Sequence, residues 1–96
     1  MLFHQEEYGK RIRLLREQTG MTQERLAEEL NISDVHLRRL ESGRSAGSVE
    51  LVIEIAAYFD VSLDYLLLGV NHGNGKLRKD LLAVADSLIS IAEEIG

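Results

Sequence analysis

Apolar side chains recur at intervals of three and four residues along almost the whole chain, and no proline interrupts them. An α-helix turns once in 3.6 residues, so this spacing gathers the apolar side chains on one face of a helix, whereas a half-buried strand would need alternation. Proline costs ~3 kcal/mol inside a helix, and its absence leaves long helices possible everywhere. The sequence therefore predicts an all-α fold.

Capping residues divide this pattern into five helices before residue 69. Thr22, Ser33, Ser48 and Ser62 each precede an apolar-periodic segment. Their side-chain oxygens can accept hydrogen bonds from the free N–H groups that begin a helix, while Gly or Asn after a segment favours the left-handed conformation that ends one. The expected helices span residues 5–19, 23–30, 34–42, 49–59 and 63–68.

A linker at 70–75 separates the expected domain, residues 1–69, from a sixth helix at 76–96. Residues 69–75 contain three glycines and two asparagines, which favour turns. Apolar residues then return with spacings of 4, 3, 4, 3 and 4, typical of a C-terminal amphipathic helix that packs against another helix. This helix either dimerises or folds back on its own chain; we expect dimerisation, because the first five helices should already close a core. Its apolar stripe consists of Leu77, Leu81, Val84, Leu88, Ile91 and Ile95.

Length and composition argue against several functional classes. A chain of 96 residues has room for one modest core. It has no cysteine for disulfides or thiolate metal sites, and its three histidines are too scattered to resemble a ligand cluster. Neither a nucleophile–base pairing nor a phosphate-binding glycine loop is evident, so we expect no metal, no cofactor and no enzymatic activity. Without a signal-peptide pattern or an apolar stretch that could span a bilayer, we expect a cytoplasmic protein with no membrane partner.

The charge distribution restricts which part of the chain could face a nucleic acid. A formal net charge of −5 is unfavourable for binding phosphates, which requires Lys and Arg. Residues 1–46 hold eight basic and eight acidic residues, whereas residues 47–96 hold three basic and eight acidic ones. Because the negative excess lies entirely in the second half, only the first half could face DNA.

Residues 21–44 form two short capped helices joined by a turn of about three residues, an arrangement in which one helix braces another in a DNA groove. The segments MTQERLA (21–27), NIS (31–33) and LRRLESG (37–43) resemble the helix-turn-helix of the Cro and lambda-repressor type family of bacterial and phage regulators. The resemblance covers about residues 8–69 and rests on many ordered positions. It implies a five-helix lambda-repressor-like domain that binds the major groove of double-stranded DNA.

The outward face of the helix after Ser33 carries the candidate base-reading residues. At about 100° per residue, Leu37 and Leu40 define the buried side of this helix. Val35 and Arg39 then point away from the core, with Arg38 on their flank. A guanidinium can bond guanine O6 and N7 bidentately for ~1–3 kcal/mol of discrimination, and valine can contact a thymine methyl group.

The resemblance also implies roles for the neighbouring positions. Gln23, helped by Thr22, would hold a phosphate and orient the recognition helix, while Ser33 and Arg44 would contact the DNA backbone. Arg16 and Glu41 match a partly buried ion pair that ties the first helix to the third. The expected DNA-binding residues are Thr22, Gln23, Ser33, Asp34, Val35, His36, Arg38, Arg39 and Arg44.

Two of these positions have alternative interpretations. Asp34 either accepts a hydrogen bond from cytosine N4 or only stabilises the positive N-terminal end of its helix. His36 either contacts DNA or packs partly against the domain, and a role as a metal ligand is a distant third.

The predicted function is sequence-specific transcriptional regulation by a homodimer on an inverted-repeat operator, acting as a repressor by occlusion. Palindromic operators match a two-fold symmetric protein. The alternative is an antitoxin-like or adaptor module whose C-terminal helix binds a different protein, which the acidic second half would suit.

Overall fold

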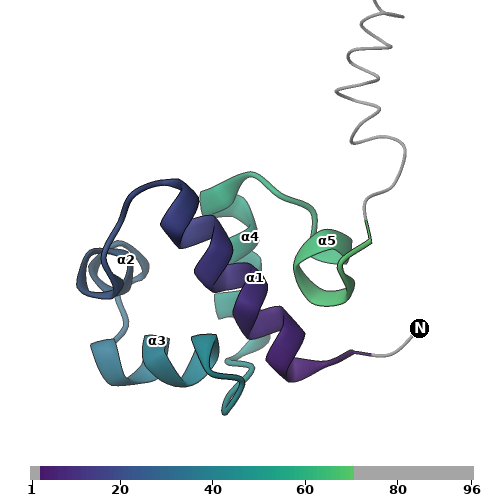
Figure 1. The fold of residues 1–96 in the computed structure, drawn as a ribbon, viewed down its shortest axis with the longest axis horizontal. Helices are drawn as coiled ribbons and strands as arrows, with labels where there is room; N and C mark the ends of the chain where they lie inside the picture. Colours follow the sequence, from purple (N-terminus) through teal and green to yellow (C-terminus); the bar gives the residue numbers. More distant parts are fainter. Residues whose placement is uncertain (1–2, 71–96) are drawn as a thin grey trace, which may run out of the picture.

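The computed structural model describes residues 3–70, which form five helices and no strands, so the all-α expectation is confirmed (Figure 1). The C-terminal helix expected at 76–96, its apolar stripe, and the linker apart from Val70 lie outside the described residues. None of the described helices is both long and apolar enough to cross a membrane. The helices are α1 (Gln5–Gln18), α2 (Gln23–Leu30), α3 (Asp34–Glu41), α4 (Val49–Phe59) and α5 (Leu63–Leu68).

Side-chain caps begin four of the five helices at the predicted residues. The hydroxyl oxygens of Thr22, Ser33, Ser48 and Ser62 each accept a hydrogen bond, 2.9–3.1 Å long, from the backbone N–H three residues later. Such caps contribute ~1 kcal/mol each. Asn31 ends α2 in the left-handed conformation, at φ 60°. The turn between α2 and α3 is therefore fixed at both ends by local hydrogen bonding.

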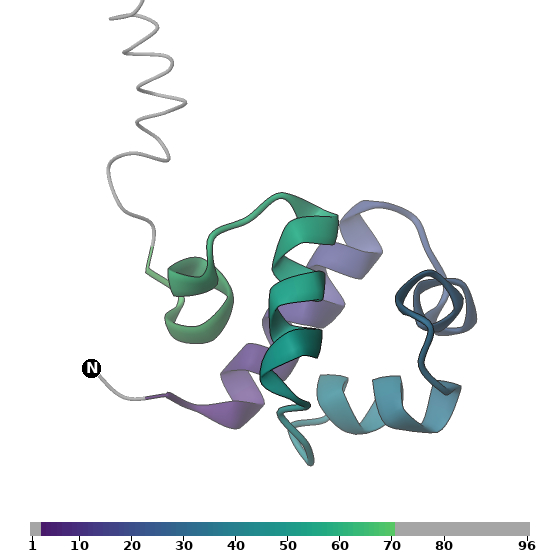
Figure 2. The ribbon, with the colours of Figure 1, turned by 180° about the vertical axis from the view of Figure 1, so that it is seen from behind.

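The two views of the ribbon show how the helices are arranged (Figures 1 and 2). Helices α1 and α4 occupy the middle of the domain, with α2 and α3 on one side and α5 on the other. Each helix contributes its apolar stripe to one shared core, which leaves α3 and α5 at opposite edges. The largest fully buried side chains are those of Tyr8, Ile12, Leu26, Leu37, Leu40, Ile55 and Leu66.

The N-terminal end of α1 holds the loop that follows α3. The Gln5 amide donates a hydrogen bond of 2.8 Å to the carbonyl oxygen of Gly43, and the Tyr8 hydroxyl donates one of 2.8 Å to that of Ala46. Burial raises the pKa of Tyr8 to about 12, so this hydroxyl stays protonated and remains a donor. The loop, which carries Arg44, is thereby tied to the body of the domain.

Arg11 closes the C-terminal end of α5. Its Nε donates to the carbonyl oxygen of Leu66 at 2.8 Å, and its Nη2 donates to that of Leu67 at 2.9 Å. The last carbonyls of a helix have no partner within the helix, and a cation satisfies them favourably. This contact fixes α5 against α1.

Gly9 allows α1 to lie unusually close to α3. A Cβ atom at this position would overlap the carbonyl oxygen of Leu40 and would lie 2.8 Å from that of Glu41. Both obstacles belong to the backbone, so no side chain can move aside. The close approach of α1 and α3 therefore requires a residue without a Cβ atom at position 9.

We expect Gly9→Ala to lower the free energy of unfolding by ~1–3 kcal/mol, because the overlap forces α1 and α3 apart. The loss should appear even though alanine is favoured over glycine inside a helix by about 1 kcal/mol. Urea denaturation followed by circular dichroism measures it. Gln18→Ala, at an exposed position of the same helix, is the control and should change stability by less than ~0.5 kcal/mol. A stabilised Gly9→Ala protein would contradict the close approach.

Candidate nucleic-acid interface

A buried carboxylate joins the three helices around the helix-turn-helix. Two parallel hydrogen bonds connect Arg16 and Glu41: Nε to Oε2 at 2.7 Å and Nη2 to Oε1 at 3.0 Å. Their side chains are only 11% and 4% exposed. The hydrogen bond to Glu41 raises the pKa of Arg16, with desolvation acting in the opposite direction. The ion pair expected between α1 and α3 is therefore present and almost completely shielded from water.

Gln23 extends this network to α2. Its amide nitrogen donates to Glu41 Oε1 at 2.9 Å, while Nη1 of Arg16 donates to the carbonyl oxygen of Met21 at 2.9 Å. An amide nitrogen carries two hydrogens, so Gln23 can hold Glu41 with one and offer the other to a phosphate. The residue expected to contact DNA is thus also part of the support for α3.

One face of α3 is directed away from the core. Leu37 and Leu40 are fully buried, whereas Val35 is 58% exposed and both Arg38 and Arg39 are exposed. No other part of residues 3–70 covers this face. Eight helical residues are ~12 Å long, which is enough to present several side chains to one groove.

A shallow hollow of about 400 Å³ lies along this face and is called here the arginine-lined hollow. The backbone N–H of Arg44 donates to the carbonyl oxygen of Arg39 at 2.8 Å, which returns the chain to the end of α3. The only carboxylate in the lining, that of Glu41, is buried and paired. The hollow is therefore positively charged. Its lining residues are Arg13, Gln23, Val35, Arg38, Arg39, Glu41, Ser42 and Arg44.

The family of the chain follows from this geometry together with a sequence match. A family model described as helix-turn-helix matches residues 12–66, which include all of α2 and α3 and the four arginines of the hollow. The chain belongs to the Cro and lambda-repressor type helix-turn-helix family.

Two relatives are transcriptional regulators by name. The chain is 35% identical over 63 residues to the HTH-type transcriptional activator BcrR of Enterococcus faecalis, across 66% of this chain and 31% of that protein. It is 34% identical over 74 residues to the HTH-type transcriptional regulator ImmR of Bacillus subtilis, across 77% of this chain and 58% of that protein. The match thus spans about a third of the length of BcrR and somewhat more than half of the length of ImmR.

Solved structures show the same fold. The restriction-modification controller protein C.AhdI from Aeromonas hydrophila superposes with a TM-score of 0.59 at 26% identity, across 65% of this chain and 94% of that one. ComR from Streptococcus suis superposes with a TM-score of 0.60 at 30% identity, across 85% of this chain and 28% of that one.

Not all of the expected interface residues of this helix-turn-helix protein lie together. Gln23, Val35, Arg38, Arg39 and Arg44 line the arginine-lined hollow. Thr22 and Asp34 line a neighbouring hollow instead, and Ser33 and His36 are not part of the lining of the arginine-lined hollow.

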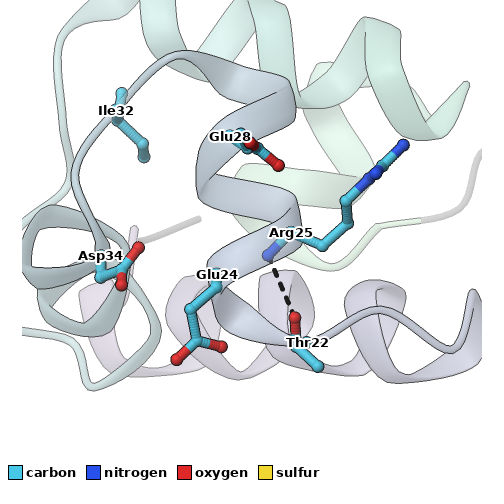
Figure 3. Close-up of a pocket in the computed structure, with 6 residues that line it drawn as sticks. All are labelled: Thr22, Glu24, Arg25, Glu28, Ile32 and Asp34. Carbon is cyan, nitrogen blue, oxygen red and sulfur yellow. Dashed lines mark hydrogen bonds between the residues drawn. The ribbon is translucent and has the colours of Figure 1, made fainter.

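A second hollow, between α2 and the start of α3, contains Thr22 and Asp34 (Figure 3). Glu24 and Glu28 of α2 and Asp34 of α3 all contribute carboxylates to its lining, and the Arg25 side chain extends away from Asp34 (Figure 3). Asp34 stands in the first turn of α3, where an acid interacts favourably with the helix dipole. Of its two interpretations, this surrounding favours stabilisation of the helix end.

His36 is partly buried, and its backbone N–H donates to the Ser33 hydroxyl at 3.0 Å. The partial burial fits the interpretation in which His36 packs partly against the domain. Within residues 3–70, no group of three or more histidine and acidic side chains is close enough to hold a metal ion.

Sequence reasoning missed Arg13, which lines the arginine-lined hollow from α1. A signal for it existed. Residues three apart lie on the same face of a helix, so the pairing of Arg16 with Glu41 already placed Arg13 on the side of α1 that faces α3. The missing information was how closely α1 and α3 approach.

We expect Glu41→Ala to lower the free energy of unfolding by ~3–5 kcal/mol, because it leaves the Arg16 guanidinium buried without its partner. The double variant Arg16→Met with Glu41→Leu should lose much less than the sum of its two single variants. Denaturant titration of the unaltered chain, Arg16→Met, Glu41→Leu and the double variant measures this coupling. Glu29→Ala, which breaks an exposed pair with Arg25, is the control and should cost less than ~1 kcal/mol. Strictly additive losses would show that the ion pair does not act as a unit.

Proposed function

We propose that this chain is a sequence-specific, double-stranded DNA-binding transcriptional regulator that places α3 in the major groove. The observation that carries the proposal is the exposed face of α3 beside a hollow with four arginines and no exposed carboxylate. The major groove is ≈ 12 Å wide and admits one α-helix. The names of the two relatives support the same function.

Each side chain of the interface has a chemical role in this proposal. Arg39 bonds the O6 and N7 atoms of a guanine, and Val35 contacts a thymine methyl group. Gln23, Arg38 and Arg44 hold phosphates beside the groove. Thr22 and Ser33 already accept hydrogen bonds as helix caps, and their hydroxyl hydrogens are available to phosphate oxygens. His36 contacts DNA only at the margin of the interface.

We further propose that the protein acts in the cytoplasm as a homodimer on an inverted repeat. Two recognition helices ~34 Å apart would enter successive major grooves on one side of the duplex. The amphipathic pattern of residues 76–96 supports dimerisation. In the described domain α3 lies at the edge opposite α5 (Figure 1). Subunits joined through residues that follow α5 in the chain would therefore leave the exposed face of α3 free in both.

The sign of regulation depends on the position of the operator. A dimer that covers a promoter excludes RNA polymerase, and repression by occlusion is the outcome we propose. BcrR is named as an activator. Activation of transcription from an upstream operator would therefore contradict the proposed repression.

A protein-interaction module, such as an antitoxin-like or adaptor protein, is the second candidate. A groove of about 420 Å³ between α4 and α5 supports it, because its lining is apolar apart from Asp64. Residues 47–70 also contain four acidic and no basic residues, which suits a basic partner. Recovery of one basic protein in every pull-down, together with no DNA shift at low salt, would favour this candidate. Its apolar lining includes Phe3, Val49, Ile53, Leu63, Leu67 and Leu68.

Selection of bound duplexes from a random pool should yield an inverted repeat, and Arg39→Ala should relax the preference at one base pair of each half-site by ~1–3 kcal/mol. Fluorescence anisotropy with the selected duplex and its single-base variants measures the change. Arg25→Ala is the control, since Arg25 is exposed but lies outside the arginine-lined hollow. If Arg39→Ala keeps both the affinity and the base preference of the unaltered chain, the assignment of α3 is wrong.

Light scattering at micromolar concentration should give the mass of a dimer. Leu88→Glu should convert the chain to a monomer, because it places a charge within the apolar stripe of the expected C-terminal helix. Ser87→Glu adds the same charge one position away, outside the stripe, and should leave the dimer intact. A monomeric unaltered chain would remove the homodimer, and equal effects of both variants would remove the role of the stripe.

A further inference from the structure

The arginine-lined hollow has one basic member that the helix-turn-helix itself does not supply. Arg13 belongs to α1, yet it lines the hollow together with Arg39 and Arg44. Its side chain is 63% exposed. We propose that Arg13 binds a phosphate of the DNA, so that the interface extends from the helix-turn-helix onto α1. This inference rests on the proposed function.

The backbone of α1 holds Arg13 beside α3. Arg16, three residues later on the same face, is fixed to Glu41 by two hydrogen bonds. One turn earlier, Gly9 brings α1 against the backbone of Leu40 and Glu41. Arg13 lies between these two anchors, so its position relative to the recognition helix is set by buried contacts.

The chemistry of the side chain suits a phosphate. A guanidinium has five N–H donors in a planar fork that matches phosphate oxygens. In Arg13, Nε bonds the Glu17 carboxylate at 3.1 Å, and the four hydrogens on the two Nη atoms are not used in that bond. Both partners of this pair are more than half exposed. Such a pair is weak, so a phosphate can compete with Glu17 for the guanidinium.

The location of Arg13 favours the DNA backbone over a base edge. Base edges are reached from within the major groove, which α3 fills. In helix-turn-helix complexes the elements beside the recognition helix lie over the sugar-phosphate backbone. A side chain from α1 at the margin of the hollow therefore meets the strand that borders the groove.

Arg25 offers a matched control within the same chain. It too is an exposed arginine, at 62%, and it too pairs with a glutamate four residues later, Glu29, at 2.9 Å. It lines two other hollows and is absent from the lining of the arginine-lined one. The two arginines thus differ mainly in where they lie.

The test measures binding of the full chain to its selected duplex between 50 and 200 mM salt. Each phosphate contact contributes about 0.9 to the slope of log affinity against log salt. Arg13→Gln should make this negative slope shallower by about 0.9. Its loss of affinity relative to the unaltered chain should therefore be about 3.5-fold smaller at 200 mM than at 50 mM salt.

The loss of affinity caused by Arg13→Gln should be the same on duplexes with altered bases, because a phosphate contact does not read sequence. Arg13→Lys should restore most of the slope, because a point charge also binds phosphate. Arg25→Gln should leave the slope unchanged.

Three outcomes would overturn the inference. If Arg13→Gln keeps the original slope while Arg39→Ala relaxes base preference, α1 does not contact DNA but the proposed function stands. If the loss in Arg13→Gln depends on sequence and Arg13→Lys does not restore binding, Arg13 reads a base. If the unaltered chain binds no duplex at low salt, the proposed function fails, and this inference fails with it. Unchanged melting temperatures of the variants verify that they fold.

Discussion

The carboxylate of Glu41 is the point on which the candidate interface depends. It accepts two hydrogen bonds from Arg16 on α1 and one from Gln23 on α2, while it belongs to α3 itself. A buried charge with its hydrogen bonds made in this way favours the observed arrangement of the three helices, since moving them apart would leave a buried ion without a partner. The exposed face of α3 is held at a fixed angle to α1 as a result.

An acidic chain can present a basic surface because its charges are separated in space. Within residues 3–70, every lysine and arginine lies between Lys10 and Arg44, and the residues from 47 onward contribute only acids. Exposed charges more than about 8–10 Å apart are largely screened at physiological salt. A phosphate at the arginine-lined hollow therefore interacts mainly with the arginines around it, and the acidic face of α4 and α5 is left for other contacts.

Local features were predictable from the sequence, and contacts between helices were less so. The caps at Thr22, Ser33, Ser48 and Ser62 form as expected, because a cap bonds a backbone N–H only three residues away. The outward direction of Val35 and Arg39 also follows from helical periodicity. The sequence did not predict that Arg13 lines the same hollow as Arg39, or that Thr22 and Asp34 line a different one, because both facts depend on how the helices cross.

The sequence by itself determined the all-α class, the boundaries of the helix-turn-helix and which face of α3 is free, since these follow from residue spacing along one chain. Only the tertiary structure decided which of the exposed side chains share a surface. That decision comes from the close approach of α1 and α3 at Gly9 and from the buried ion pair beside it. Both bring together residues more than twenty positions apart, a distance over which local periodicity carries no information.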